Sequence, residues 1–158
     1  MQPPIDAVDA RLLRLIQADA RLTAAQLSQH LALSPSACHR RLQRLEAAGV
    51  VRGVVALLDA RAVGRPTTVF VEISLASQAD DVLAAFEAAV ARIPDVLECH
   101  LMTGAHDYLL KVAARDSEDF ARIHRRHLAR LPGVARLQSS FALKTVCGTT
   151  ALPVEPSA

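Results

Sequence analysis

The 158-residue sequence predicts an α+β protein made of an N-terminal winged helix-turn-helix domain and a ferredoxin-like βαββαβ domain. Apolar residues recur at helical spacing through the first fifty residues, and strand-like and helical periods alternate from residue 67 onward. Between them, Gly64 and Pro66 interrupt a stretch that has no apolar period. These observations predict domains over residues 1–50 and 67–150, a strand and linker over 51–66, and a tail over 151–158.

The first two helices are predicted from apolar spacing and capping residues. A helix is expected over residues 9–19, with Asp9 placed to cap its start or to favour it. Thr23 is expected to cap a short second helix, because its side chain can accept hydrogen bonds from the first unpaired backbone N–H groups. That helix is expected to stop at Leu31.

A third helix is predicted directly after a tight connection. Ser34 supplies an N-cap, and Pro35 takes the first helical position, where its missing N–H costs nothing. Gly49 is the expected terminator. Cys38 and Leu45 belong to the inner face of this helix, so its outer face is polar.

The rest of the chain predicts one small sheet domain. Residues 50–58 are expected to form a strand or a wing before the domain boundary. Strands are then expected over 67–75, 96–102, 108–113 and 134–146, and helices over 80–93 and 117–131. This βαββαβ order predicts a four-stranded antiparallel sheet with both helices on one face. The strands carry apolar residues toward both faces of this sheet. We therefore expect the face that the helices leave uncovered to be covered by dimerisation.

Composition excludes several classes of protein. No apolar run is long enough for a membrane span and no secretory signal is evident, so a cytoplasmic protein without membrane contact is expected. Three isolated cysteines suggest neither disulfides nor a zinc site. Residues 1–60 hold seven arginines against five acids, whereas residues 61–158 hold eleven basic and eleven acidic residues. The net positive charge of the chain therefore lies within residues 1–60.

The outer face of the third predicted helix has the pattern of a DNA-reading helix. Such a helix enters the major groove with its first turn against base edges, so small polar residues belong there and cations further along. The alternative is a solvated basic face, but three arginines within five positions favour DNA binding. The candidate DNA-binding residues are Ser34, Ser36, Ala37, His39, Arg40, Arg41 and Arg44.

Two stretches carry a specific resemblance to a known family. LSPSACHRRLQRLEAAGVVRGVVALLD resembles the helix-turn-helix of the Lrp/AsnC family, and ECHLMTGAHDYLLKV resembles that family's effector-domain signature. The resemblance implies that Ser36, Ala37 and Arg40 face bases and that His39, Arg41 and Arg44 contact phosphates. Arg40 and Ala37 depart from the residues frequent in relatives, which leaves the operator sequence open.

The segment from Thr103 to Tyr108, which joins two predicted strands, is the candidate effector loop, although its glycine and short polar residues would also suit an ordinary hairpin. An amino-acid effector needs backbone N–H groups, an acid and an apolar wall, which Gly104, Asp107 and Met102 could supply. The resemblance implies binding between subunits, with a second wall from a neighbour's final strand. The candidate residues are Met102, Thr103, Gly104, Asp107, Tyr108 and Ser139.

The leading function is thus an effector-responsive transcription regulator that binds double-stranded DNA as a homodimer, or as an octamer built from dimers. Two alternatives stay open: an architectural DNA-binding protein without an effector, and a small ferredoxin-like ligand carrier or enzyme. No spacing suggests a catalytic triad, paired carboxylates or a phosphate-binding loop, so no catalytic residue is assigned. The histidines are expected to be solvated, and neither a metal nor a cofactor is expected.

Overall fold

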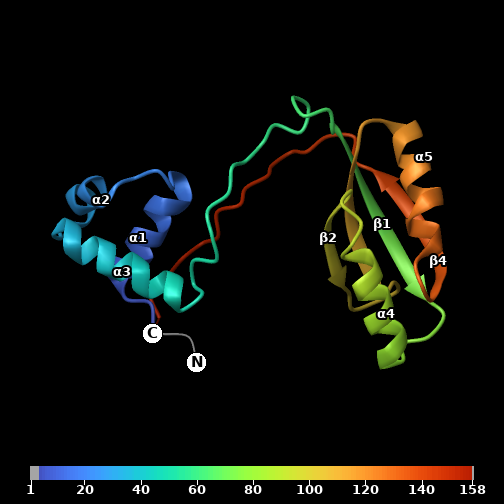
Figure 1. Ribbon diagram of the computed structural model, residues 1–158, viewed down its shortest axis with the longest axis horizontal. Helices are drawn as coiled ribbons and strands as arrows, with labels where there is room; N and C mark the ends of the chain where they lie inside the picture. Colours follow the sequence, from blue (N-terminus) through green and yellow to red (C-terminus); the bar gives the residue numbers. More distant parts are fainter. Residues whose placement is uncertain (1–3, 158) are drawn as a thin grey trace. The chain divides into compact units, whose positions relative to one another are not determined.

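The computed structural model describes residues 4–157 and divides the chain into two compact units. Unit 1 consists of the chain up to Ala56 together with the chain from Val146 onward, and unit 2 is Leu57–Thr145 (Figure 1). The chain therefore passes from one unit to the other twice. Within the described residues, no helix has the length and apolar content needed to cross a membrane.

Unit 1 contains three helices, which are α1 (Ala7–Ala18), α2 (Ala24–Leu31) and α3 (Pro35–Ala47). The predicted caps of α2 and α3 are confirmed, because the Thr23 and Ser34 side chains accept hydrogen bonds from backbone N–H groups three residues ahead. Gly49 follows α3 at φ +71°, a conformation that a side chain would disfavour. The core of the unit is formed by Leu12, Leu13, Leu27, Leu31, Cys38 and Leu45.

The start of α1 differs from the prediction. Asp6, not Asp9, caps the helix, which begins at Ala7. Asp9 occupies the third helical position, and its carboxylate accepts a hydrogen bond from the Asp6 N–H while the Asp6 carboxylate accepts one from the Asp9 N–H. This reciprocal capping box holds the side chain of Asp9 completely inside the unit.

The predicted strand or wing over residues 50–58 does not form. A strand needs a neighbour to accept and donate its ladder hydrogen bonds, and no described segment pairs with this one. Val50 and Val51 pack against the core of unit 1, but the apolar side chains that follow lie in solvent, with Val54 at 69% and Val55 at 80% exposure. The segment is an extended connection between the units.

Unit 2 has the predicted βαββαβ order: β1 (Thr67–Leu75), α4 (Asp80–Val90), β2 (Val96–Leu101), β3 (Tyr108–Ala114), α5 (Ser117–Arg126) and β4 (Val134–Phe141). The antiparallel sheet has the strand order β2-β3-β1-β4. The second predicted helix is shorter than expected, because α5 ends at Arg126 and a separate 3-10 turn follows over Leu128–Arg130. The last strand also ends earlier, at Phe141.

Both helices of unit 2 cover the same face of the sheet. Val69, Val71 and Ile73 alternate along β1 and therefore point to one side, where they pack with Phe86 of α4 and Phe120 of α5. The opposite face is more polar than the sequence suggested. There Phe70 lies opposite Lys111, and Leu109 lies opposite Glu72.

The predicted C-terminal tail is part of unit 1. Gln17 of α1 exchanges two hydrogen bonds with the backbone of Leu152, at 2.7 and 3.0 Å. Arg14 donates to the carbonyl of Val154 at 2.8 Å, and the Val154 side chain packs against the helical core. In the structure unit 2 is Leu57–Thr145, and residues near the C-terminus hold α1.

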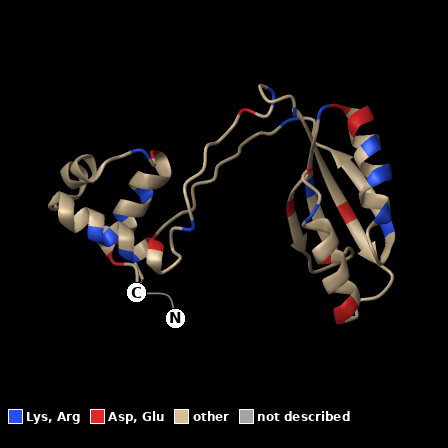
Figure 2. Ribbon diagram, viewed as in Figure 1, with Lys and Arg blue, Asp and Glu red and all other residues tan. Residues whose placement is uncertain are grey.

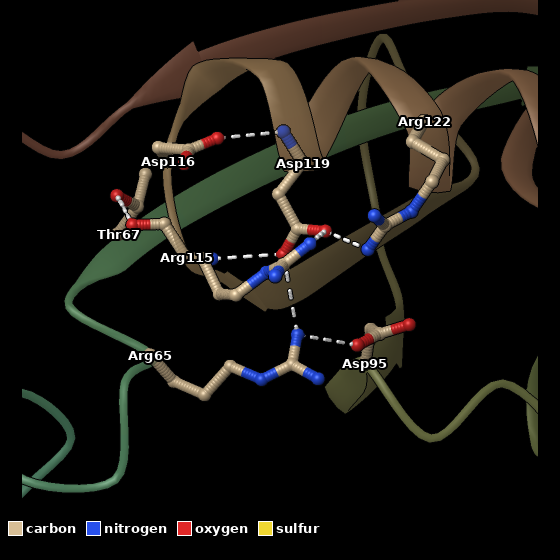
Figure 3. Close-up of polar contacts among 7 residues, drawn as sticks. All are labelled: Arg65, Thr67, Asp95, Arg115, Asp116, Asp119 and Arg122. Atoms are coloured by element: carbon tan, nitrogen blue, oxygen red, sulfur yellow. Dashed lines mark hydrogen bonds and ion pairs between the residues drawn. The ribbon is translucent and has the colours of Figure 1, made fainter.

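The first residues of unit 2 are held by an ion-pair network (Figure 3). Arg65 lies 2.8 Å from Asp95 and 3.4 Å from Asp119, whose side chain is 1% exposed. Arg115 and Arg122 also pair with Asp119. These cations hold the pKa of Asp119 at about 2, below its ordinary value; the hydrogen bond from the Arg115 side chain is the largest cause.

Candidate DNA interface and effector loop

The first turn of α3 presents small polar groups to solvent. The Ser34 hydroxyl accepts a hydrogen bond from the Ala37 N–H at 3.2 Å and lies 3.1 Å from the Ser36 hydroxyl. Ser34, Ser36, His39 and Arg40 are exposed, and Ala37 is half-buried. Arg40 has no ion-pair partner within residues 4–157, so its guanidinium is available to an external acceptor. This surface has the composition that a base-reading first turn requires.

The other two arginines of α3 contact α1. Nη1 of Arg41 lies 2.6 Å from Oδ2 of Asp6 and 2.8 Å from Oδ1 of Asp9. Arg44 makes a further hydrogen bond to the Asp9 carboxylate through Nη2. Hydrogen bonding from the Asp9 N–H, followed by that from Arg41, lowers the pKa of the Asp6 carboxyl. These contacts fix the orientation of α3 against α1.

The sequence reasoning missed this pair of carboxylates. Asp6 and Asp9 are three residues apart at a helix start, and Arg41 and Arg44 have the same spacing on another helix. Residues three apart lie on one face of a helix, so two such pairs of opposite charge can meet. That spacing is the signal that would have found them.

The candidate effector loop connects β2 to β3 and is fastened to the end of β1. The Met102 N–H donates to the Asp107 carbonyl at 2.8 Å, and the Asp107 N–H donates to the Ile73 carbonyl at 2.9 Å. Met102, Thr103 and Gly104 are exposed. Gly104 has φ +124°, and no atom lies within 4 Å of the place where a Cβ would be. The backbone there is open to an approaching molecule.

The Asp107 carboxylate is already engaged within the chain. It accepts hydrogen bonds from the Leu75 N–H and from the Gln78 side-chain amide, both at 2.7 Å. Beside it, His106 lies 3.3 Å from both the Ser74 hydroxyl and the Glu72 carboxylate. Sequence reasoning missed Gln78 and Glu72, since both lie about thirty residues before the loop. Asp107 therefore positions the loop on β1.

Tyr108 and Ser139 lie apart from the exposed part of the loop. The Tyr108 hydroxyl donates to Glu87 at 2.8 Å, and its ring packs on Phe86. Burial, together with Glu87, raises the pKa of Tyr108. Tyr108 also lines a cavity of about 420 Å³ between α4 and β2, with Val90, Val96, Leu97 and Leu101 among the other lining residues. Ser139 lies half-buried on β4 opposite Val71, and no hydrogen bond joins it to the loop within residues 4–157.

Comparison with known proteins agrees with this architecture. Residues 5–52 match a family described as winged helix-turn-helix DNA-binding, and residues 68–152 match the Lrp/AsnC ligand binding domain. The leucine-responsive regulatory protein of Salmonella typhimurium is 37% identical over 142 residues, which are 90% of this chain and 87% of that protein.

Solved structures extend the agreement to the whole fold. The transcriptional regulator NMB0573 of Neisseria meningitidis, described as an L-Met complex, has a TM-score of 0.88 and 40% identity, covering 94% of this chain and 96% of its own. The feast or famine regulatory protein of M. tuberculosis, described as complexed with L-methionine, has a TM-score of 0.84 and 30% identity, covering 94% and 98% of the two chains.

A helix-turn-helix unit joined to a ligand-binding α+β unit defines a DNA-binding transcriptional regulator. The chain belongs to the Lrp/AsnC family of such regulators.

Proposed function

We propose that this regulator reads a specific operator through α3 and changes its DNA affinity when a small amino acid binds at the Met102–Tyr108 loop. The observation that carries the proposal is the exposed first turn of α3, where Ser34, Ser36 and Arg40 are free of core contacts while the back of the helix is tied to α1. A rigidly held helix with an open polar turn is suited to groove reading.

In this proposal the residues of α3 divide into two groups. Ser36, Ala37 and Arg40 contact base edges, with Ser34 at the helix start beside them. His39, Arg41 and Arg44 contact phosphates. A guanidinium carries five N–H donors, so Arg44, which is 47% exposed, can keep its bond to Asp9 and still donate to a phosphate. Arg41 is 28% exposed and has less of its surface available.

The effector site in this proposal centres on the open backbone around Gly104. Exposed N–H groups of Thr103 and Gly104 would hold the carboxylate of an amino acid, and the Met102 side chain would contact its apolar part. Because Asp107 is hydrogen-bonded to β1, it supports the loop as well as offering a charge to the ammonium group. Tyr108 braces the loop from the buried side. The L-methionine complexes of two relatives support an amino-acid ligand.

The remaining wall of the site would come from Ser139 and its neighbours in another subunit. The protein would therefore act as a homodimer or a larger assembly of dimers, up to an octamer, in the cytoplasm. A helix-turn-helix dimer places two such helices about one DNA turn apart. Sedimentation of the full chain with and without ligand would establish the assembly.

The experiment is a calorimetric titration of the full chain with L-methionine and then with the other nineteen amino acids, alongside operator binding at fixed salt. At least one amino acid should bind and shift the operator affinity. Asp107→Asn keeps an acceptor for the Leu75 N–H but removes the charge, so it should weaken ligand binding and leave operator affinity unchanged. Asp107→Ala should additionally loosen the loop. If no amino acid alters DNA binding, the architectural alternative replaces this one.

A further inference from the structure

The charges of unit 2 are balanced in number but separated along the chain. Residues 61–119 contain five Lys or Arg and ten acids, whereas residues 120–154 contain six Lys or Arg and no Asp or Glu. The basic residues of the second stretch begin on α5. Figure 2 shows basic residues along α5 beyond an acidic first turn.

Four arginines form a basic face on α5 and the turn that follows it. Phe120 and Ile123 hold the inner side of the helix in the core of unit 2. The outer side is exposed and repeats cations at intervals of three and four residues, which places them on one surface. The basic face of α5 consists of Arg122, Arg125, Arg126 and Arg130.

Most of these arginines form no ion pair within the described residues. Arg122 pairs with Asp119, but Arg125, Arg126 and Arg130 have no ion-pair partner in the part of the chain that the structure describes. Cations in a last helical turn interact favourably with the helix dipole, which accounts for Arg125 and Arg126 in part. It does not account for Arg130, which lies beyond the helix end. A surface that serves solubility alone mixes both signs.

We propose that the basic face of α5 is a second DNA-contacting surface, which binds the phosphate backbone of the duplex whose operator α3 recognises. Guanidinium groups are well suited to phosphate oxygens because their planar N–H donors can bind two at once. His124 and His127 lie among these arginines, but no Ser, Thr, Asn or Gln does, and α5 is not part of the helix-turn-helix. We therefore expect this contact to be with phosphates and independent of sequence.

Duplex DNA is the fitting polyanion because the same chain carries a DNA-binding unit. Once α3 is bound, the adjoining duplex is present at a high effective concentration for any other cationic surface of the protein. The contact would add affinity for DNA of every sequence and would bring flanking DNA onto unit 2. It requires no effector.

The test compares two double variants of the full chain with equal change in charge. R125Q/R126Q removes half of the basic face, and R61Q/R92Q removes two other exposed arginines of unit 2. Affinity for an operator duplex and for a scrambled duplex is measured at several salt concentrations. Each phosphate contact contributes about 0.9 to the slope of log affinity against log salt, so R125Q/R126Q should reduce the slope by about two on both duplexes. R61Q/R92Q should leave it unchanged.

Two further measurements keep the result interpretable. R125K/R126K retains the charge and should keep nearly all of the slope. Tyr108 is the single tyrosine of a chain without tryptophan, so its fluorescence reports whether unit 2 is folded in each variant. The proposal is overturned if R125Q/R126Q, with a native tyrosine signal, keeps the parental slope, or if R61Q/R92Q loses as much.

Discussion

Arg41 of α3 donates a hydrogen bond to Asp9 of α1 over 2.8 Å, and the Asp9 side chain is completely buried. A buried carboxylate is tolerated only when cations and N–H groups compensate for its lost hydration. Arg41, Arg44 and the Asp6 N–H supply that compensation. The recognition helix is therefore attached to α1 by charge as well as by apolar packing.

Asp9→Asn should destabilise unit 1. The amide preserves an acceptor for the Asp6 N–H but leaves two arginines without their buried partner, at a cost of about 2 kcal/mol. Cys38 is buried in the core of unit 1, so its reaction with a thiol reagent reports opening of that unit. In a C99S/C147S background, labelling of Cys38 should become about thirtyfold faster.

The matched control is Asp19→Asn, because the Asp19–Arg21 pair is on the surface, with Arg21 92% exposed. Exposed pairs contribute little to stability, so labelling should change by less than about threefold. Equal labelling rates for Asp9→Asn and the parent protein would show that the buried pair is not stabilising.

Arg40→Ala and Arg44→Ala should have different effects on DNA binding. Arg40→Ala should weaken operator binding by about 1–3 kcal/mol and relax one operator position, because a base contact is lost. Arg44→Ala should weaken all duplexes alike, lower the salt slope by about one and also speed Cys38 labelling. Selection from a randomised duplex library, together with salt titrations, measures both. An unchanged selected sequence for Arg40→Ala would refute its base-reading role.

Acid should destabilise unit 2 through Asp119. Its pKa in the folded chain is about 2, below its ordinary value near 4, so the folded state binds this proton more weakly than the unfolded state. The resulting stabilisation is complete above about pH 4 and is lost as the pH falls toward 2. Urea unfolding followed by Tyr108 fluorescence should show this loss, and Asp119→Asn should reduce it. Glu118→Gln, on the exposed side of the same turn, should retain the parental pH dependence.

Removing residues 152–158 should loosen α1. The truncation deletes both hydrogen bonds to Gln17, the Arg14 contact and the packing of Val154, which together contribute about 2 kcal/mol. Gln17→Ala should have about half that effect. Hydrogen exchange of the α1 amides measures both, with Glu155→Gln as a control for charge. If exchange in α1 is the same after truncation, the C-terminal residues do not support this unit.

The local features of the chain could be predicted from the sequence because their causes lie within a few residues. Thr23 and Ser34 cap their helices through N–H groups three positions away, and the alternation in β1 directly reflects which side chains point inward. The βαββαβ order follows from the succession of helical and strand-like spacings of apolar residues along the chain. The same reasoning identified the exposed first turn of α3.

Contacts between distant segments were decided only by the tertiary structure. Asp9 was expected to favour a helix start, but its surroundings depend on two arginines more than thirty residues away. Asp107 was expected to offer its charge to a ligand, yet its partners are Leu75 and Gln78. The apolar pattern of residues 50–58 suggested a strand, but no described segment pairs with it. Hydrogen-bond partners and burial arise from chain segments that meet only on folding, and no local period encodes them.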